Sequence, residues 1–405
     1  MLRILYAAGP GDVIGTYRHW LAGQDDPSQV SMTYSGQFFD VCRELGAEGH
    51  IVASHATADV LRGPGMTAEH LVKRSGRHGL RYHLEEVRYG LRLVGAARRF
   101  QADVAIVAEG STHWFVLRLL PLLGIALAPT IHCVLWPKFK QPRGLQRLLN
   151  GMAGRLFRRH CVAVMSASED ITQQVRELTD GRPREIVPFL PSYRKTTFAE
   201  IGAPPFTTTP FRVLFAGRVE RNKGVFDMLA IAERFAAAGR SEIEFDLCGT
   251  GSALDELRRA VEAAGLGARF RLHGHCSRAR MREMLHESHT LIVPTTTSFI
   301  EGFNQVVVES VLAGRPVITS SVCPALSTVR DAVVEVPPDD VAAYGDAILR
   351  LQSDREFYES KRRACFAYQE QFYDPAQGWG AALKRVAQIV RTQREIVQEA
   401  RPISA

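Results

Sequence analysis

The sequence predicts an α/β fold in which two Rossmann-like domains each contain a parallel sheet covered by helices. Short apolar runs rich in Val, Ile, Leu and Phe alternate with helical patterns along the 405 residues, as in parallel sheets that are buried on both faces. The alternation is interrupted at 201–210 (IGAPPFTTTP), where three prolines, three threonines and a glycine favour a linker. The simplest interpretation is therefore two such domains, one on each side of this segment.

The elements follow this division along the chain. We expect a first domain over 1–200, a linker over 201–210, a second domain over 211–355, and a helical tail over 356–405 that packs back toward the first domain. The predicted strands of the first domain are LRILYA, HIVASH, ADVAIVAE, APTIHCVL, CVAVMSA and EIVPFL. Those of the second are FRVLFAG, EIEFDLCG, RFRLHG, TLIVPT, RPVITS and AVVEVP. Because doubly wound sheets bind ligands beyond the carboxyl ends of their strands, we expect a ligand cleft there.

Composition limits the partners and the compartment. Apolar residues make up 46% and charged residues 23%, which is typical of a globular protein with a large core. The net charge of +7 comes from 1–200, with 25 Lys/Arg against 18 Asp/Glu, whereas 201–405 has 25 of each. The first half should therefore attract an anionic partner such as a membrane surface or a phosphate-bearing ligand. Nucleic acid is not expected, since the aromatic and basic patterns of RNA-binding modules are absent.

Cysteine usage and the chain start favour a cytoplasmic protein, with the inner face of the membrane as a second location. The seven cysteines are scattered without a CxxC pair, which indicates reduced thiols and no metal site. The start, MLRILYAAGPGD, lacks the features of a signal peptide, and the most apolar stretch, WFVLRLLPLLGIALAPT, is too interrupted to span a bilayer.

Two strand ends of the second domain carry candidate phosphate-binding loops. In FAGRVERNKG the strand ends at Gly217, and Arg218 and Lys223 follow, two cations that suit a polyanion; a solvated basic turn is the alternative. In LCGTGSALDEL, Gly249 begins half of a dinucleotide fingerprint, but Leu254 stands in place of the third glycine. This weakens a dehydrogenase hypothesis and favours a tight turn near a ligand.

The most informative stretch is FIEGFNQVVVES, at 299–310. Glu301 stands just before a predicted helix that Gly314 ends, so the first backbone N–H groups of that helix form an anion site. Glu309 lies among valines, where a carboxylate is costly without a partner. Two carboxylates that face one ligand explain the pattern, and a helix-end charge with a buried salt bridge is the alternative.

Taken together, these motifs resemble a family. The pair Glu301-x7-Glu309, followed by AGRPVITS and preceded by GRVERNKG, resembles the family-4 retaining glycosyltransferases of the GT-B fold over nearly all of 211–340. The first half agrees more loosely, through SGQFFDVCRELGAEGHIVASH, TIHCVLW and VAVMSASEDITQQV. The resemblance implies a transferase that moves a sugar, with retention, from a nucleotide-diphosphate sugar to a hydroxyl acceptor: a glycan, a lipid-linked molecule or a small molecule.

The resemblance also implies a role for each candidate residue. Arg218 and Lys223 would neutralise the diphosphate. Glu301 would accept hydrogen bonds from sugar hydroxyls and Glu309 from the ribose, and His132 would lie near the reacting centre. The remaining donor-binding candidates are Gly36, Gly217, Gly249, His275, Cys276, Gly302, Phe303, Asn304 and Gln305. No metal and no cofactor are expected, because the cations and the helix start supply the electrostatic stabilisation.

Two departures from the family pattern stand out. An insertion over 8–34 separates the first strand from SGQFF, which puts the assignment of Gly36 in doubt. Asn304 also stands where a second glycine is commoner.

Other interpretations stay open. A nucleotide-sugar epimerase or hydrolase on the same fold would turn over donor without acceptor, and a non-enzymatic binder of anionic lipid or nucleic acid would not need Glu301. His113, in EGSTHW, is a second candidate histidine. The basic stretch 138–160 has seven Lys/Arg and no acid; its apolar helical face either covers the sheet of the first domain or docks on anionic lipid.

Overall fold

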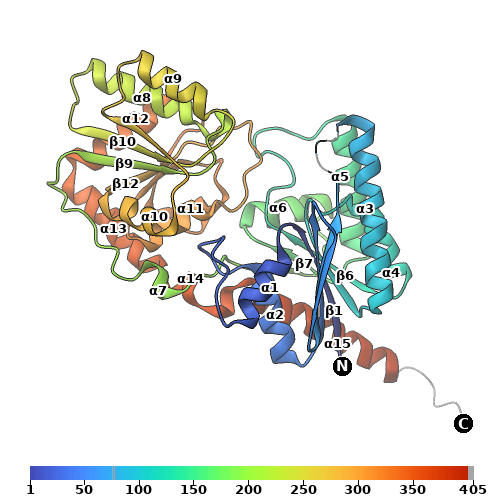
Figure 1. The fold of residues 1–405 in the computed structure, drawn as a ribbon. Helices are drawn as coiled ribbons and strands as arrows, with labels where there is room; N and C mark the ends of the chain where they lie inside the picture. The colour runs from blue at the N-terminus through green and yellow to red at the C-terminus, as the bar shows by residue number, and fades with distance from the viewer. Residues whose placement is uncertain (75, 77, 400–405) are drawn as a thin grey trace, which may run out of the picture. The chain divides into compact units, whose positions relative to one another are not determined.

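The computed structural model describes residues 1–74, 76 and 78–399. The chain forms two compact units (Figure 1). Unit 1 contains Met1–Leu135, Pro142–Tyr193 and the chain from Asp374 onward, and unit 2 contains Trp136–Gln141 and Arg194–Tyr373.

Unit 1 is built on an eight-stranded sheet with the order β3-β4-β2-β1-β5-β6-β7-β8, parallel except for the antiparallel pair of β3 and β4. The strands are β1 (Arg3–Pro10), β2 (Glu48–His55), β3 (Asp59–Gly63), β4 (Met66–Val72), β5 (Val104–Ala108), β6 (Ala126–Ile131), β7 (Val164–Ser166) and β8 (Ile186–Pro188). The order reverses between β1 and β5, which makes their carboxyl ends the expected ligand edge.

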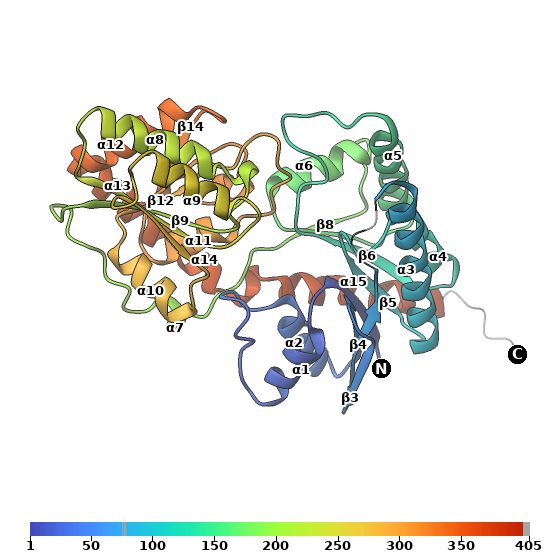
Figure 2. The ribbon, with the colours of Figure 1, turned by 45° about the horizontal axis from the view of Figure 1, so that its top comes forward.

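Helices cover both faces of this sheet (Figure 2). One layer contains α1 (Val13–Leu21), α2 (Tyr34–Leu45) and α15 (Trp379–Glu399); the other contains α3 (Gly79–Phe100), η1 (Trp114–Arg118), α4 (Leu119–Leu122), α5 (Gly144–Arg159) and α6 (Glu169–Leu178). The C-terminal helix α15 packs against α2, and its Trp379, Leu383, Val386 and Val390 are buried in the unit 1 core. Helix α15 is therefore part of the unit 1 core, whereas residues 356–373 of the predicted tail belong to unit 2.

Unit 2 contains a fully parallel six-stranded sheet with the order β11-β10-β9-β12-β13-β14. Its strands are β9 (Phe211–Ala216), β10 (Ile243–Cys248), β11 (Phe270–Gly274), β12 (Thr290–Val293), β13 (Val317–Ser320) and β14 (Val333–Val336). Its helical segments are α7 (Lys195–Phe198), η2 (Arg221–Lys223), α8 (Val225–Ala237), α9 (Leu254–Ala263), α10 (Arg278–Glu287), α11 (Gln305–Leu312), η3 (Pro324–Ser327), η4 (Arg330–Ala332), α12 (Val341–Ser353), α13 (Arg355–Tyr368) and α14 (Glu370–Tyr373). A further short helix, η5 (Pro375–Gln377), leads into α15.

The predicted fold class of two α/β units with parallel sheets is confirmed, and each of the twelve predicted strands overlaps an observed one. The hairpin of β3 and β4 was not predicted. Polar and small residues interrupt its apolar positions, and nine of its twelve strand residues are exposed or half-buried because it forms the sheet edge. The insertion after β1 forms α1, whose Tyr17 packs its ring on Phe39 of α2.

Candidate functional site

A pocket of about 260 Å³ lies in unit 2, at the carboxyl ends of β9 and β12. These strands are neighbours where the strand order reverses, the place where open parallel sheets bind ligands. Its lining residues are Phe215, Ala216, Gly217, Arg218, Lys223, Val293, Thr295, Glu301, Asn304, Gln305, Val306 and Glu309. Seven of the candidates named from the sequence therefore meet at one pocket.

Lys223 and Glu301 form the central ion pair of this pocket, with 2.6 Å between Nζ and Oε2. The side chains are only 13% and 7% exposed. Thr295 Oγ1 and Asn304 Nδ2 also donate to Oε2, at 2.9 and 3.2 Å, whereas Oε1 accepts only from the backbone N–H of Gly302, at 3.2 Å, among the described residues. Oε1 therefore keeps capacity for further donors, and the ammonium of Lys223 has two more hydrogens to donate.

Both cations of the pocket also contact the ring of Phe299. Nζ of Lys223 lies 4.0 Å from the ring centroid and the guanidinium carbon of Arg218 lies 5.6 Å from it. Arg218 is exposed, and its guanidinium forms no hydrogen bond or ion pair with a described residue. The ring of Phe299 contacts both cations without neutralising either. Because Lys223 is paired with Glu301, the charge of Arg218 is the one that stays fully available to an anionic ligand.

Helix α11 begins at this pocket. Its N-cap residue Asn304 has φ of 64° and makes no side-chain cap bond. A positive φ is a conformation that Gly and Asn adopt most readily, which accounts for Asn304 where glycine is commoner in the family pattern. Asn304, Gln305 and Val306 line the pocket, and the first N–H groups of a helix lack intrahelical acceptors. The helix start therefore provides donors for an anion.

Glu309 lies one turn further along α11 and is half-buried. Its carboxylate makes no hydrogen bond or ion pair within the described part of the chain, and burial raises its pKa to about 7. Burial is the one cause of this raised pKa, and no described residue compensates for it. A carboxyl group of this kind that lines a pocket is a candidate for contact with a ligand.

The other loop candidates of unit 2 lie at the same sheet edge but do not line the pocket. The N–H of Gly249 donates to the carbonyl of Gly274, at 2.7 Å, and a Cβ on Gly249 would lie 1.7 Å from the carbonyl oxygen of Gly217. Only glycine therefore fits at 249. His275 is exposed, Cys276 and Gly302 are half-buried, and Phe303 is buried. Their donor contacts remain predictions.

His132 follows β6 in unit 1 and belongs to a chain of neutral hydrogen bonds. Trp379 Nε1 donates to Thr130 Oγ1 at 3.0 Å, and Thr130 Oγ1 lies 3.2 Å from His132 Nε2. If the hydroxyl of Thr130 donates to Nε2, the ring proton is on Nδ1, which is buried and has no partner among the described residues. Burial lowers the pKa of His132 to about 3, so the ring is neutral at neutral pH.

Glu109 fixes the backbone beside His132. Its Oε2 accepts the N–H of His132 at 2.7 Å, and burial raises its pKa to about 7. Gly36 lies inside α2, where its N–H donates to the capping Thr33 hydroxyl at 3.0 Å, so its donor contact stays a prediction. His113 pairs with His83, Nδ1 of which lies 2.9 Å from His113 Nε2.

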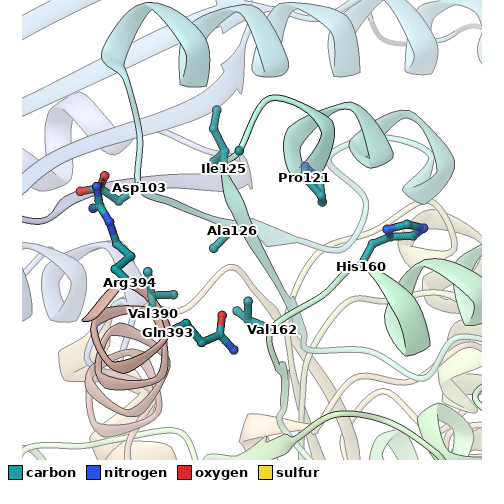
Figure 3. A pocket seen from close by; sticks show the side chains of 10 residues that line it. Asp103, Pro121, Ile125, Ala126, His160, Val162, Val390, Gln393 and Arg394 are labelled. Carbon is teal, nitrogen blue, oxygen red and sulfur yellow. Dashed lines mark ion pairs between the residues drawn. The ribbon is translucent and has the colours of Figure 1, made fainter. Parts of the chain in front are cut away.

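A second pocket, of about 520 Å³, lies in unit 1 (Figure 3). Its lining residues Asp103 and Ala126 stand at the starts of β5 and β6. This pocket therefore lies at the amino ends of the strands, on the opposite edge of the sheet from their carboxyl ends. The carboxylate of Asp103 is already bound by Arg394 and by the N–H of Arg3. The polar groups that line this pocket do not form a set of charges facing one space, as Lys223 and Glu301 do in unit 2.

Several site residues escaped the sequence analysis. Thr295 and Phe299 follow β12 directly, and their position after a strand end was the available signal. Glu109 also follows a strand end, that of β5, and Thr130 stands two residues before His132, so both had a local signal that was not used. Trp379 left none, because it is 249 positions from Thr130, to which it donates. No cluster of His, Cys, Asp and Glu among the described residues has the arrangement of a metal site. Nor does any helix of the described residues have the length and apolarity to cross a membrane.

Comparisons with known proteins find glycosyl transferases that are similar to this chain. Residues 198–369 match the family of group 1 glycosyl transferases. The chain is 25% identical over 276 residues to 2-deoxystreptamine N-acetyl-D-glucosaminyltransferase of Streptomyces fradiae, which covers 64% of this chain and 63% of that protein. The chain thus spans somewhat less than two thirds of this curated relative.

Solved structures agree in fold. The sucrose-phosphate synthase of Thermosynechococcus elongatus has a TM-score of 0.66 at 16% identity and covers 99% of this chain and 100% of its own. The α,α-trehalose 6-phosphate synthase of Burkholderia multivorans has a TM-score of 0.73 at 12% identity, with 98% and 100% covered. HepE of Anabaena, solved with UDP and glucose, has a TM-score of 0.63 at 14% identity, with the same coverage. The fold is therefore GT-B. The similarity of residues 198–369 to the group 1 glycosyl transferases supports an enzyme of the transferase class.

Proposed function

We propose that the chain is a family-4 retaining glycosyltransferase that moves a sugar from a nucleotide-diphosphate sugar to a hydroxyl acceptor. The observation that carries this proposal is the unit 2 pocket, where Lys223, Arg218 and the start of α11 surround one space with Glu301 and Glu309. The cations and the helix start suit a diphosphate, and the carboxylates suit hydroxyl groups. The pocket lies inside the segment that matches the glycosyl transferase family.

Each group has a distinct role in this proposal. As the glycosyl bond breaks, negative charge grows on the leaving diphosphate, and Lys223 and Arg218 stabilise it. Oε1 of Glu301 accepts hydrogen bonds from the sugar while Oε2 stays bound to Lys223. Glu309 accepts from the ribose. His132 lies near the reacting centre as a neutral ring that adds no charge.

The partners and the compartment complete the proposal. UDP is the first nucleotide to test, because HepE binds it on this fold. The acceptor is a glycan, a lipid-linked molecule or a small molecule with a free hydroxyl. The seven free thiols suit a reducing compartment, so we place the enzyme in the cytoplasm, with a peripheral contact at the inner membrane face.

A thermal-shift series with UDP, GDP and ADP tests donor binding, since a ligand that binds the folded state raises its stability by mass action. We expect one nucleotide to raise the melting temperature of the wild type and to fail with Lys223→Ala. Product NMR with the matching nucleotide sugar then reports the anomeric configuration. Donor turnover without an acceptor would favour the epimerase or hydrolase alternative, and an inverted product would contradict retention.

A further inference from the structure

Two helices of unit 1 expose leucines that cover nothing. On α3 these are Leu80, Leu84 and Leu91, at 74%, 49% and 50% exposure, and on α5 they are Leu145 and Leu148, at 53% and 59%. The spacings of four, seven and three residues place each set on one side of its helix. Large exposed apolar side chains gathered in this way mark an interaction surface more often than scattered ones do.

Arginines surround these leucines. Apart from Arg98 and Arg99, which are also exposed in the last turn of α3, the exposed arginines of the same helices and of the residue before α5 are Arg81, Arg88, Arg143, Arg147, Arg155 and Arg159. None of the six forms an ion pair with a described residue. We call this set of five leucines and six arginines the α3–α5 surface.

Neither helix carries an exposed acid of its own. The acids of α3, Glu85 and Glu86, are buried, and they pair with Arg92 at 3.1 Å and with Lys73 at 2.8 Å. The sequence of α5 contains no Asp or Glu. The α3–α5 surface is therefore apolar and positive together, which is the composition of an interfacial helix.

The two helices lie in one layer of unit 1. Both contact η1, and both views show them on the same side of the sheet (Figures 1 and 2). Helix α3 connects β4 to β5 and helix α5 connects β6 to β7, and each runs antiparallel to these strands. Both helices therefore begin at the carboxyl edge of the sheet. Their exposed leucines are concentrated in these first turns, except Leu91.

The apolar face of the basic stretch 138–160 was expected either to cover the sheet of the first domain or to dock on anionic lipid. The structure shows which part of the helix covers the sheet. Ala153, Leu156 and Phe157, in the second half of α5, are buried in the unit 1 core. Leu145 and Leu148, in the first half, are exposed. Covering the sheet therefore accounts for the second half of the helix alone, and the first half needs another explanation.

We propose that the α3–α5 surface docks on an anionic lipid bilayer, with the arginines at the headgroups and the leucines among the upper acyl chains. The charge selects this occupant, since anionic headgroups attract arginine, and the bilayer boundary accepts leucines that no protein segment covers. This docking rests on the proposed function, which includes a peripheral membrane contact, and it identifies the surface that makes this contact. A lipid-linked acceptor would lie in the same membrane. Vesicle binding itself does not depend on glycosyl transfer.

Vesicle co-sedimentation of the full chain tests the proposal. We expect binding to vesicles that contain phosphatidylglycerol, weaker binding to pure phosphatidylcholine, and loss of binding at high salt, where the Debye length falls to about 3 Å at 1 M. The triple variant Arg88→Gln, Arg147→Gln and Arg155→Gln should bind about 10²-fold more weakly, about fivefold per arginine. The double variant Leu84→Ser and Leu148→Ser should bind about 10-fold more weakly at low salt.

Matched controls separate this surface from net charge. Arg259, Arg355 and Arg363 are exposed arginines of unit 2 without ion pairs to described residues, and their change to Gln removes the same charge. Leu21→Ser with Ile396→Ser removes equally exposed apolar side chains elsewhere, at 52% and 59% exposure. Equal losses in the test and control variants, or absence of binding at low salt, would overturn the proposal. Displacement by free phosphate alone would reassign the surface to a soluble anion. UDP binding by unit 2, measured in parallel, should be unchanged in all four variants, so this result is separate from the proposed function.

Discussion

The pocket of unit 2 and the surroundings of His132 in unit 1 are built on opposite principles. In unit 2, Lys223 and Glu301 place charges of both signs against a space of about 260 Å³. In unit 1, Trp379, Thr130 and His132 form a neutral chain, and burial keeps the histidine uncharged. Charge in the first region suits a charged leaving group, and a fixed neutral donor in the second suits orientation. Substitutions should therefore have larger effects in unit 2 than in unit 1.

The largest effect is expected from Lys223→Ala. Loss of one positioned charge at the leaving group should lower turnover by about 10²-fold or more. The variant should also lose stability, by about 1–3 kcal/mol, because Glu301 is then a buried carboxylate without its cation. Steady-state kinetics and chemical denaturation measure the two losses.

The double variant Lys223→Met with Glu301→Gln is the control for this first prediction. It removes both charges and should recover much of the stability without recovering turnover. If stability and turnover recover together, Lys223 would have a structural role only.

The next largest effect is expected from Glu301→Gln, which keeps the shape and removes the charge. Hydrogen bonds to a charged group contribute roughly 1.5–3 kcal/mol, so turnover should fall about 10- to 150-fold while nucleotide binding survives better. Calorimetric titration of the nucleotide diphosphate separates binding from chemistry. A large loss of nucleotide affinity in this variant, with wild-type affinity in Glu309→Gln, would exchange the roles of the two acids.

The same contrast explains what the sequence could predict. The groups around the unit 2 pocket come from two local motifs, each at a strand end that leads into a helix, so spacing predicted Arg218, Lys223, Glu301 and Glu309 together. His132 was predicted as a lone strand-end histidine. Trp379, which donates to its neighbour Thr130, is 249 positions from Thr130 along the chain, and only the packing of α15 into unit 1 brings these two together. The spacing of residues in a short motif predicts only local geometry. A hydrogen bond between residues far apart in the sequence has no characteristic spacing, so it could not be predicted.

A smaller effect is expected in unit 1 from Thr130→Val. The change removes the acceptor of Trp379 Nε1 and the partner of His132 Nε2. Turnover should fall about 5- to 10-fold, the scale of one hydrogen bond of about 1–1.5 kcal/mol. ¹⁵N NMR of the ring should show a single Nδ1–H tautomer in the wild type and a mixture in the variant. Thr130→Ser should keep both the tautomer and the rate, and a wild-type tautomer in Thr130→Val would remove Thr130 from this role.

The smallest effect is a pH dependence of stability that originates at Glu309. Burial raises the pKa of Glu309 to about 7 in the folded state, above the value of about 4.3 expected in the unfolded chain. Between these values the folded state binds more protons than the unfolded state, so the free energy of unfolding falls as pH rises toward and through about 7. From pH 6 to 8 the loss should be at most about 1 kcal/mol, since the half-buried carboxylate keeps some solvation.

Denaturation of the ligand-free wild type and of Glu309→Gln at several pH values measures this loss of stability. The variant should lack this part of the decline and keep the part that comes from Glu109, whose pKa is also raised to about 7. Identical pH profiles for the two proteins would mean that Glu309 is ionised with an ordinary pKa, and its place facing the ribose would then lose its electrostatic support.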